Sequence, residues 1–445
     1  MLLNDEGVPF DTFACSGSNA DFNAFQDWSI AGMHTQPLDN MTPPAFLPKL
    51  DTTGILAGTA PLARFRLTRL ADGGCILGVN FAHLVIDGIS GAMFCSAWSL
   101  QHEALARGVG VETPPKLPMG EPIFDRRVFV KAATTVPSDV PEEAIANART
   151  VHVRVTSLMA AVTPGKLLKR CLKIGSDVLL RKNANFTIRI SGPQMARARA
   201  AGAAATGTPL SSNDVAIGIA WTLLRRMRAR GPGGAPRLVA PSDGAAAEHF
   251  MLQTVDLRRY LPGLPPNYFG NCAWAIRVAA PVTADTPSQF AAGSRASLAL
   301  FADSTTVFEQ ASMMLQAGAQ PGVEQLKAMF LPAFADGMIS SWHLPMMWDF
   351  TWGCGKPVWF AGGIFPVAPW GFCVLAGRPD AVAAGTPPDF LLQGSCPANK
   401  LRAVVEEAQR LVVELCGADP PATAQQQPTA QEAAPESVTA RSSDE

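Results

Sequence analysis

The sequence lacks the features that mark several common protein classes. Its nine cysteines are odd in number and form no C-x-x-C pair, which indicates reduced thiols rather than a zinc site or a disulfide framework. The first residues have neither the basic patch nor the apolar run of a secretory signal. The 36 basic and 37 acidic residues nearly cancel, so no net charge favours a nucleic acid or an anionic membrane. We expect a cytoplasmic monomer that binds a small molecule and no nucleic acid.

Frequent catalytic motifs are missing as well. The chain has no G-x-S-x-G elbow, no G-x-x-x-x-G-K-[ST] phosphate loop and no pair of histidines at metal-ligand spacing. The longest uncharged stretch, residues 358–377, could span a bilayer in length, but its glycines and prolines favour buried strands joined by turns. The sequence therefore predicts neither a metal site nor a membrane span.

A β-hairpin followed by a helix is predicted around residue 83. Apolar residues alternate at period two in 63–67 and 75–81, on either side of the glycine-containing segment 71–74. The second strand leads directly to His83 in the segment His83-Leu84-Val85-Ile86-Asp87-Gly88, and helical periodicity then continues to Gly108. His83 is therefore predicted at the point where a strand gives way to a helix.

Other patterns suggest how the rest of the chain is organised. Residues 186–190 and 250–255 are predicted strands, and a serine or Asx cap within Ser211-Ser212-Asn213-Asp214 opens a predicted helix with an apolar stripe. Proline-rich residues 109–149 predict an irregular crossing, and 401–415 an amphipathic helix. We divide the chain into an N-terminal lobe (1–165), a linker or crossover (166–190), a C-terminal lobe (191–417) and a disordered tail (418–445).

The H-x-x-x-D segment at 83–87 is the candidate chemical centre. A neutral imidazole can take a proton from a hydroxyl or amine that attacks a carbonyl, and histidine ordinarily titrates near neutral pH. By itself the motif is a weak signal, because a lone histidine at a strand end is more often structural. The spacing does not show whether Asp87 touches the His83 ring.

Further segments follow His83–Gly88 in a fixed order. They are Pro122-Ile123-Phe124-Asp125-Arg126, Ser211 to Trp221, Val255-Asp256-Leu257-Arg258, Leu264 to Asn271, Ser341-Trp342 and Asp349 to Pro357. This order resembles the BAHD acyltransferases, plant-type acyl-CoA-dependent transferases that include the hydroxycinnamoyl transferases. The resemblance covers roughly residues 1–416.

The resemblance implies an α/β fold of two similar lobes of the chloramphenicol acetyltransferase type, with mixed sheets flanked by helices and an active-site channel between the lobes. His83 would be the general base that moves a non-aminoacyl group from acyl-CoA to an alcohol or amine acceptor in secondary metabolism. Asp87 would point away from the channel and pair with Arg258, as a positioning residue. Acyl-CoA is the expected co-substrate, and no permanently bound cofactor is expected.

The sequence departs from the family pattern at several points. Thr351 stands in the place of an aspartate, although Trp352, Gly353 and Gly355 match and are expected to bind substrate. Where relatives that acylate shikimate or quinate carry an arginine after Ser-Trp, this chain has His343 and Leu344, which disfavours an acidic acceptor and makes His343 a candidate for the acceptor pocket. His83 also comes early in the chain, so the first strand and helix of the first lobe are expected to be missing.

Other functions stay open on the sequence. The altered 351–357 segment is compatible with a catalytically inactive small-molecule-binding protein of the same fold, and the short N-terminus with a folding-defective fragment. A condensation-domain-like, amide-forming enzyme is less favoured, because those domains show two adjacent histidines where this chain has Ala82-His83.

Overall fold

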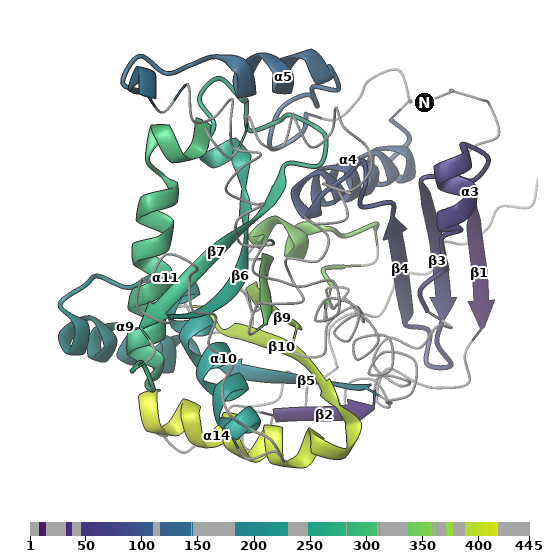
Figure 1. Ribbon diagram of the computed structural model, residues 1–445. Coiled ribbons are helices and arrows are strands. Elements are labelled where there is room, and N and C mark those ends of the chain that lie inside the picture. The colour runs from purple at the N-terminus through teal and green to yellow at the C-terminus, as the bar shows by residue number, and fades with distance from the viewer. Residues whose placement is uncertain are drawn as a thin grey trace, which may run out of the picture.

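The computed structural model contains two β-sheets with flanking helices (Figure 1). The residues that it describes are 9–14, 33–37, 46–109, 116–143, 145, 183–229, 248–281, 283–308, 311, 337–342, 344–353, 355–357, 360, 371–376 and 388–416. The predicted tail at 418–445, most of the predicted linker and the candidate residue His343 lie outside these residues. Within the described ranges, no helix is both long and apolar enough to cross a bilayer.

The smaller sheet has the order β1-β3-β4 and contains the predicted hairpin. Its strands are β1 (Phe10–Ala14), β3 (Ala63–Arg69) and β4 (Cys75–Phe81), and the short helix α3 (Thr52–Ala57) precedes β3. Gly73 occupies the turn with a φ of 85°, which glycine adopts without steric cost. Leu70 N–H donates to the Gly74 carbonyl at 2.8 Å and closes the turn. The predicted hairpin is confirmed.

Helix α4 (Gly88–Ala106) follows β4 and packs on the smaller sheet. The Asp87 carboxylate caps its N-terminus by accepting a hydrogen bond from Ser90 N–H at 2.8 Å. The Phe94 ring stacks on Phe65 of β3, with the centroids 5.6 Å apart, and thereby anchors the helix on the hairpin. The expected change from strand to helix around His83 is confirmed, and the cap fixes where the helix begins.

The larger sheet has the order β2-β5-β10-β9-β8-β6-β7 and mixes parallel with antiparallel pairs. Its strands, in that order, are Met33–Pro37, Asn183–Ile190, Phe390–Pro397, Gly371–Ala376, Met338–Trp342, Glu248–Asp256 and Ala273–Pro281. β2 comes from the segment assigned to the first lobe and β5 from the segment assigned to the linker, yet both are strands of the larger sheet. The chain therefore passes between the two sheets more often than the sequence suggested.

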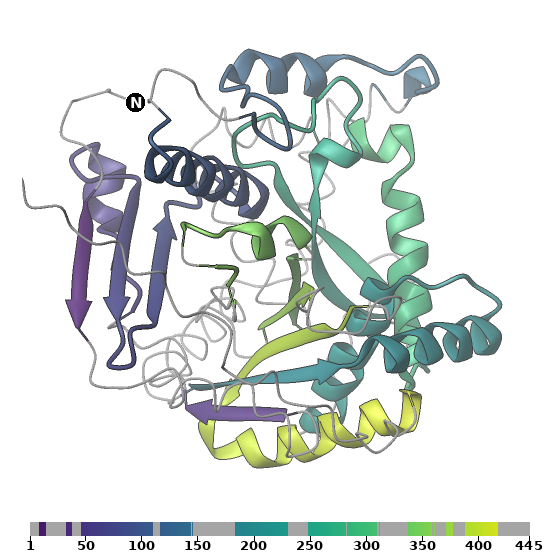
Figure 2. The same cartoon turned by 180° about the vertical axis from the view of Figure 1, so that it is seen from behind.

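Helices cover the side of the larger sheet that faces away from the smaller one (Figures 1 and 2). They are α9 (Gly192–Thr206), α10 (Ser212–Ala229), α11 (Pro287–Phe301) and α14 (Leu401–Cys416). The main hydrophobic core lies between these helices and the sheet, where Trp221 of α10 contacts Phe290 of α11 with the ring centroids 4.7 Å apart. The helix predicted to open at 211–214 and the helix predicted over 401–415 are both confirmed.

The prediction of an irregular crossing over 109–149 is wrong in part. Helix α5 (Arg126–Thr134) forms within it, because Asp125 caps the first turn by accepting from Arg127 N–H at 3.0 Å. Its apolar side packs on the main core through Val128 and Phe129. Surrounding prolines concealed a short amphipathic helix in the sequence.

Candidate active site

His83 lies in the turn between β4 and α4, and its side chain is exposed. The residues on both sides of the turn, Ala82 and Ile86, are buried. Ala82 N–H donates to the Leu62 carbonyl at 2.7 Å, and Val85 N–H donates to the Ala82 carbonyl at 3.0 Å. The backbone around the imidazole is therefore fixed, while the ring itself is reachable from solvent.

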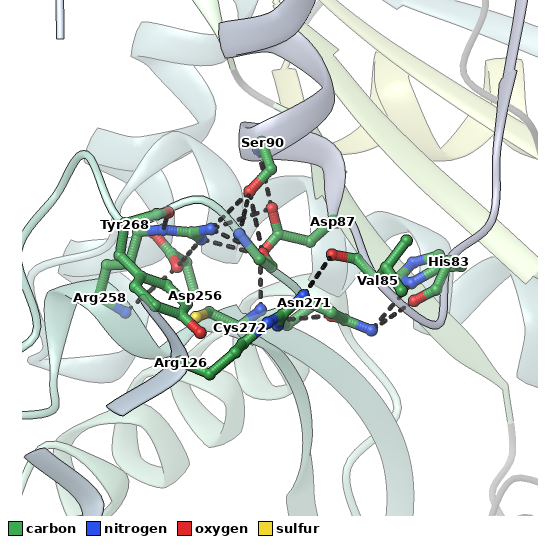
Figure 3. A network of polar contacts seen from close by, with 12 residues as sticks. His83, Val85, Asp87, Ser90, Arg126, Asp256, Arg258, Tyr268, Asn271 and Cys272 are labelled. Atoms are coloured by element: carbon green, nitrogen blue, oxygen red, sulfur yellow. Dashed lines mark hydrogen bonds and ion pairs between the residues drawn. The ribbon is translucent and has the colours of Figure 1, made fainter. Parts of the chain in front are cut away.

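Asn271, just before β7 of the larger sheet, contacts His83, which follows β4 of the smaller sheet (Figure 3). Its Nδ2 donates to the His83 carbonyl at 2.6 Å and lies 3.2 Å from the ring Nδ1. Its Oδ1 accepts from Ala273 N–H at 3.2 Å, which fixes the orientation of the amide. Two residues that are far apart in the sequence thus hold the imidazole at the junction of the two sheets.

The Asp87 carboxylate is buried and turned away from His83 (Figure 3). Arg258 Nη1 lies 2.8 Å from its Oδ2, so the two residues form the ion pair that the sequence suggested. Cys272 N–H donates to the same oxygen at 2.7 Å, and Ser90 N–H donates to Oδ1 at 2.8 Å. Asp87 therefore joins the start of α4 to the segment that precedes β7.

Arg258, in the 3-10 turn η1 (Leu257–Arg259), is also buried, and donates from all three of its nitrogens. Besides Asp87, its acceptors are Asp256 Oδ1 at 2.8 Å, the Tyr268 carbonyl at 2.9 Å, the Gly270 carbonyl at 2.9 Å and Ser90 Oγ at 2.8 Å. Burial opposes the charged guanidinium, but the hydrogen bonds and negative charges around it outweigh burial, and the pKa of Arg258 is raised. This saturated network is rigid because no donor of Arg258 is left to exchange partners.

Ser90 and Gly270 complete the connection between α4 and the larger sheet. Ser90 Oγ donates to the Gly270 carbonyl at 2.9 Å and accepts from Gly270 N–H at 3.0 Å. A Cβ on Gly270 would lie 2.8 Å from Arg126 Nη1 and from a ring carbon of Tyr268, so the position has room only for glycine. The segment before α5 is fixed beside it, since Phe269 N–H donates to the Ile123 carbonyl at 2.8 Å.

A thiol also lies in this region, but it is not an available nucleophile. Burial raises the pKa of the Cys272 thiol to about 12, so the thiolate is nearly absent at neutral pH. The exposed His83 ring, with its Nδ1 3.2 Å from Asn271 Nδ2, is thus the candidate base in this region.

Trp342, at the end of β8, packs against the start of α4. A Cβ on Gly88 would lie 3.5 Å from the indole, and the indole Nε1 donates to Ser340 Oγ at 3.1 Å. His343, the candidate for the acceptor pocket, is outside the described residues, although its neighbour Leu344 is fixed by a bond from its N–H to the Trp342 carbonyl at 2.8 Å.

The segment from Thr351 to Gly355 is not next to His83. The N–H groups of Thr351 and Trp352 both donate to Ser99 Oγ, at 3.0 and 3.3 Å. Ser99 is in the second half of α4, about 18 Å along the helix from Asp87 at the helical rise. Gly353 and Gly355 adopt φ values of 76° and 89°, which allow the tight turn. Trp352 and Gly353, which we expected to bind substrate together with Gly355, therefore lie against the second half of α4, at Ser99 and His102.

Sequence reasoning did not assign roles to Asn271 and Ser90. Each bonds to a residue 180 or more positions away in the sequence, Ser90 to Gly270 and Asn271 to His83, and no local sequence pattern indicates such a contact. Among the described residues, no three histidine, cysteine, aspartate or glutamate side chains gather as metal ligands.

The chain is similar to known proteins in sequence and fold. A model of the Transferase family matches residues 3–378. TRI101 of F. graminearum, solved with coenzyme A and deoxynivalenol, is 16% identical, with 90% of this chain and 80% of that chain covered and a TM-score of 0.53. TRI101 of F. sporotrichioides, solved with coenzyme A and T-2, is 16% identical over 90% and 80%, with a TM-score of 0.54. Vinorine synthase is 17% identical over 94% and 78%, with a TM-score of 0.52.

These likenesses support the α/β, two-lobe fold that the sequence suggested. No curated protein sequence matches the chain.

Proposed function

Because this chain belongs to the Transferase family, the family of the BAHD acyltransferases, we propose that it moves an acyl group from a coenzyme A thioester to a hydroxyl or amine, with His83 as the general base. The observation that carries the proposal is the exposed His83 imidazole, held at the junction of the two sheets by Asn271. Two TRI101 structures contain coenzyme A together with a small toxin molecule, which supports a thioester donor and a small-molecule acceptor.

The proposed reaction needs one proton carrier. The lone-pair nitrogen of the His83 ring removes the proton of the acceptor O–H or N–H while the acceptor oxygen or nitrogen bonds to the thioester carbonyl carbon. The tetrahedral adduct then collapses, the carbon–sulfur bond breaks, and the imidazolium returns the proton to the departing thiolate. The products are the acylated acceptor and free coenzyme A, so the protein ends the cycle unchanged.

Asn271 bears on which ring nitrogen is the base. While Nδ1 accepts from the Asn271 amide, the hydrogen of the neutral ring is on Nε2, and Nε2 cannot accept a proton. We propose that the reactive tautomer carries its hydrogen on Nδ1, which frees Nε2 for the acceptor. The 3.2 Å contact to Nδ1 is then released, while the shorter 2.6 Å bond to the His83 carbonyl keeps the turn in place.

Asp87 is proposed as a positioning residue. The Asp87 carboxylate accepts four hydrogen bonds, from Ser90, Arg258 and Cys272. These contacts support a role in fixing the turn rather than in relaying the proton. The altered Thr351 segment lies on the far half of α4, so its departure from the family pattern does not favour an inactive protein over an enzyme. We further propose that the protein acts as a cytoplasmic monomer, and its odd number of cysteines without a C-x-x-C pair supports a reducing compartment.

The direct test follows thiol release from a set of acyl-CoA donors with mixed alcohol and amine acceptors. The unmodified protein should release free thiol when an acceptor is present, and His83→Gln should reduce the rate by about 10²–10⁴-fold, the usual contribution of a general base. Cys272→Ala is the matched control, because it removes the neighbouring thiol but leaves the base. Equal rates for His83→Gln and the unmodified protein would disprove the role of His83.

A further inference from the structure

A row of polar side chains crosses the larger sheet from strand to strand. The row, named here the polar row, consists of Thr254 of β6, Ser340 of β8, Cys373 of β9, Gln393 of β10 and Thr187 of β5. Backbone register pairs Ser340 with Cys373, Cys373 with Gln393, and Gln393 with Thr187. Thr254 joins through its side chain, which donates to Ser340 Oγ at 3.0 Å.

The polar row lies on the face of the sheet opposite to the helices. Because side chains alternate along a strand, the neighbours of the row point the other way. Ile339, Phe372, Val374 and Leu392 indeed belong to the core beneath the helices, whereas Cys373 packs with Leu391 near Trp342. The polar row therefore faces the same side as Trp342, which contacts the start of α4 beside the His83 turn.

Gln393 is buried without any hydrogen-bond partner within the part of the chain that the structure describes. It is 2% exposed, and both its Nε2 and its Oε1 are unpaired. Thr187, its neighbour across the strands, is fully buried with an unpaired hydroxyl. Gln253 offers a contrast: it is equally buried but points to the helices, where its Oε1 accepts from Ser294 Oγ at 3.0 Å. Buried amides are normally satisfied, so the free donor and acceptor of Gln393 indicate a missing partner.

The surroundings of Gln393 along the polar row offer hydrogen bonds and no charge. None of the five polar-row side chains carries a full charge at neutral pH, and the nearby Arg189 is already paired with Asp389 at 2.6 Å. Ser340, which holds the Trp342 indole, and Gln393 are two strand spacings apart, about 10 Å. The polar row therefore leads from Gln393 toward Ser340 and Trp342, and the Trp342 indole lies against Gly88 at the start of α4.

We propose that Gln393 and Thr187 bind an uncharged hydrogen-bonding group of the acceptor, a hydroxyl, carbonyl or amide remote from the atom that is acylated. This inference rests on the proposed acyl transfer at His83. The Gln393 carboxamide can bind such a group because it donates through Nε2 and accepts through Oε1. A carboxylate or ammonium group of the acceptor would instead be buried there without a counter-ion. The acceptor class is thus a neutral alcohol or amine with a second polar group.

Binding can be measured without turnover. The probes are alkane diols of increasing length and the matching primary alcohols, which lack only the remote hydroxyl. At one chain length the diol should raise the melting temperature of the unmodified protein more than the alcohol does, and Gln393→Leu should abolish that difference. A control, Gln253→Leu, makes the same change on the opposite face and should retain the difference. Equal shifts for diol and alcohol at every length would overturn the proposal.

Turnover separates this inference from the proposed function. With acetyl-CoA as donor, Gln393→Leu should reduce the diol-to-alcohol ratio of kcat/KM roughly tenfold and leave the KM for acetyl-CoA unchanged. A raised KM for acetyl-CoA in Gln393→Leu would assign the polar row to the donor and overturn the acceptor site. If the diol preference in melting is intact while no thiol release depends on His83, the acceptor site stands as a binding site and the proposed reaction fails.

Discussion

Two pairs of residues join the His83 turn to the larger sheet. They differ in solvent exposure and in how fully their hydrogen-bonding groups are paired. His83 and Asn271 meet at a ring that is exposed and lies 3.2 Å from the Asn271 amide, whereas Asp87 and Arg258 are buried with their hydrogen bonds satisfied. The buried pair fixes the backbone, and the exposed pair leaves one side chain adjustable. The two residues of the H-x-x-x-D motif thus differ in role, with a rigid support at Asp87 and a proposed reactive group at His83.

The largest expected effect breaks the buried pair. Asp87→Asn should lower the free energy of unfolding by up to about 3–5 kcal/mol, because it removes the more deeply buried of the two carboxylates that pair with Arg258 and leaves Asp256 as the remaining counter-ion. His83→Ala, at an exposed position, should change that free energy by less than about 0.5 kcal/mol. Urea denaturation of both variants measures the contrast. Similar losses in the two variants would show that the motif does not divide in this way.

A smaller effect is expected at the exposed pair. Asn271→Asp places a carboxylate beside Nδ1 of His83, which favours the protonated imidazolium, a form that cannot act as a base. The acidic limb of the pH–rate profile should therefore move to higher pH.

Asn271→Ala is the matched control for this shift. It removes the amide without adding charge, so it should lower kcat but leave the acidic limb in place. A shift of the same size in both variants would mean that the carboxylate does not act on the ring.

The sequence could predict what depends on local periodicity and local caps. The period-two pattern before His83 and the helical pattern after Gly88 placed the candidate base correctly between β4 and α4. The Asp87–Arg258 pair came from the resemblance, since no spacing could connect residues 171 positions apart. Helix α5 was missed although Asp125 is a readable cap, because the surrounding prolines outweighed it.

The contacts of Asn271 and Gln393 were beyond sequence reasoning for a different reason. Asn271 reaches His83 because its neighbours Gly270 and Cys272 are hydrogen-bonded to Ser90 and Asp87 at the start of α4. The register that aligns Gln393 with Thr187 depends on the sheet order. One signal was nevertheless present in the sequence: Gln393 is a long polar side chain directly after the apolar run Phe390-Leu391-Leu392, and the structure shows that this strand is buried throughout. A buried polar residue without a helical or capping role is a reason to look for a ligand.

The smallest expected effect concerns the far half of α4, where the Trp352 turn packs. Gly353→Ala should lower the free energy of unfolding by about 1 kcal/mol, because its φ of 76° strains any residue with a Cβ. No steric clash adds to this, since the nearest atom to the new Cβ would be 3.8 Å away on His102. The values of kcat and KM should be unchanged if this turn only covers the helix.

Gly355→Ala, with a φ of 89° and no atom within 4 Å of the new Cβ, should behave in the same way. A selective rise in the KM for acyl-CoA in either variant would instead extend the site along α4 from His83 to the Trp352 turn, as the family resemblance suggested.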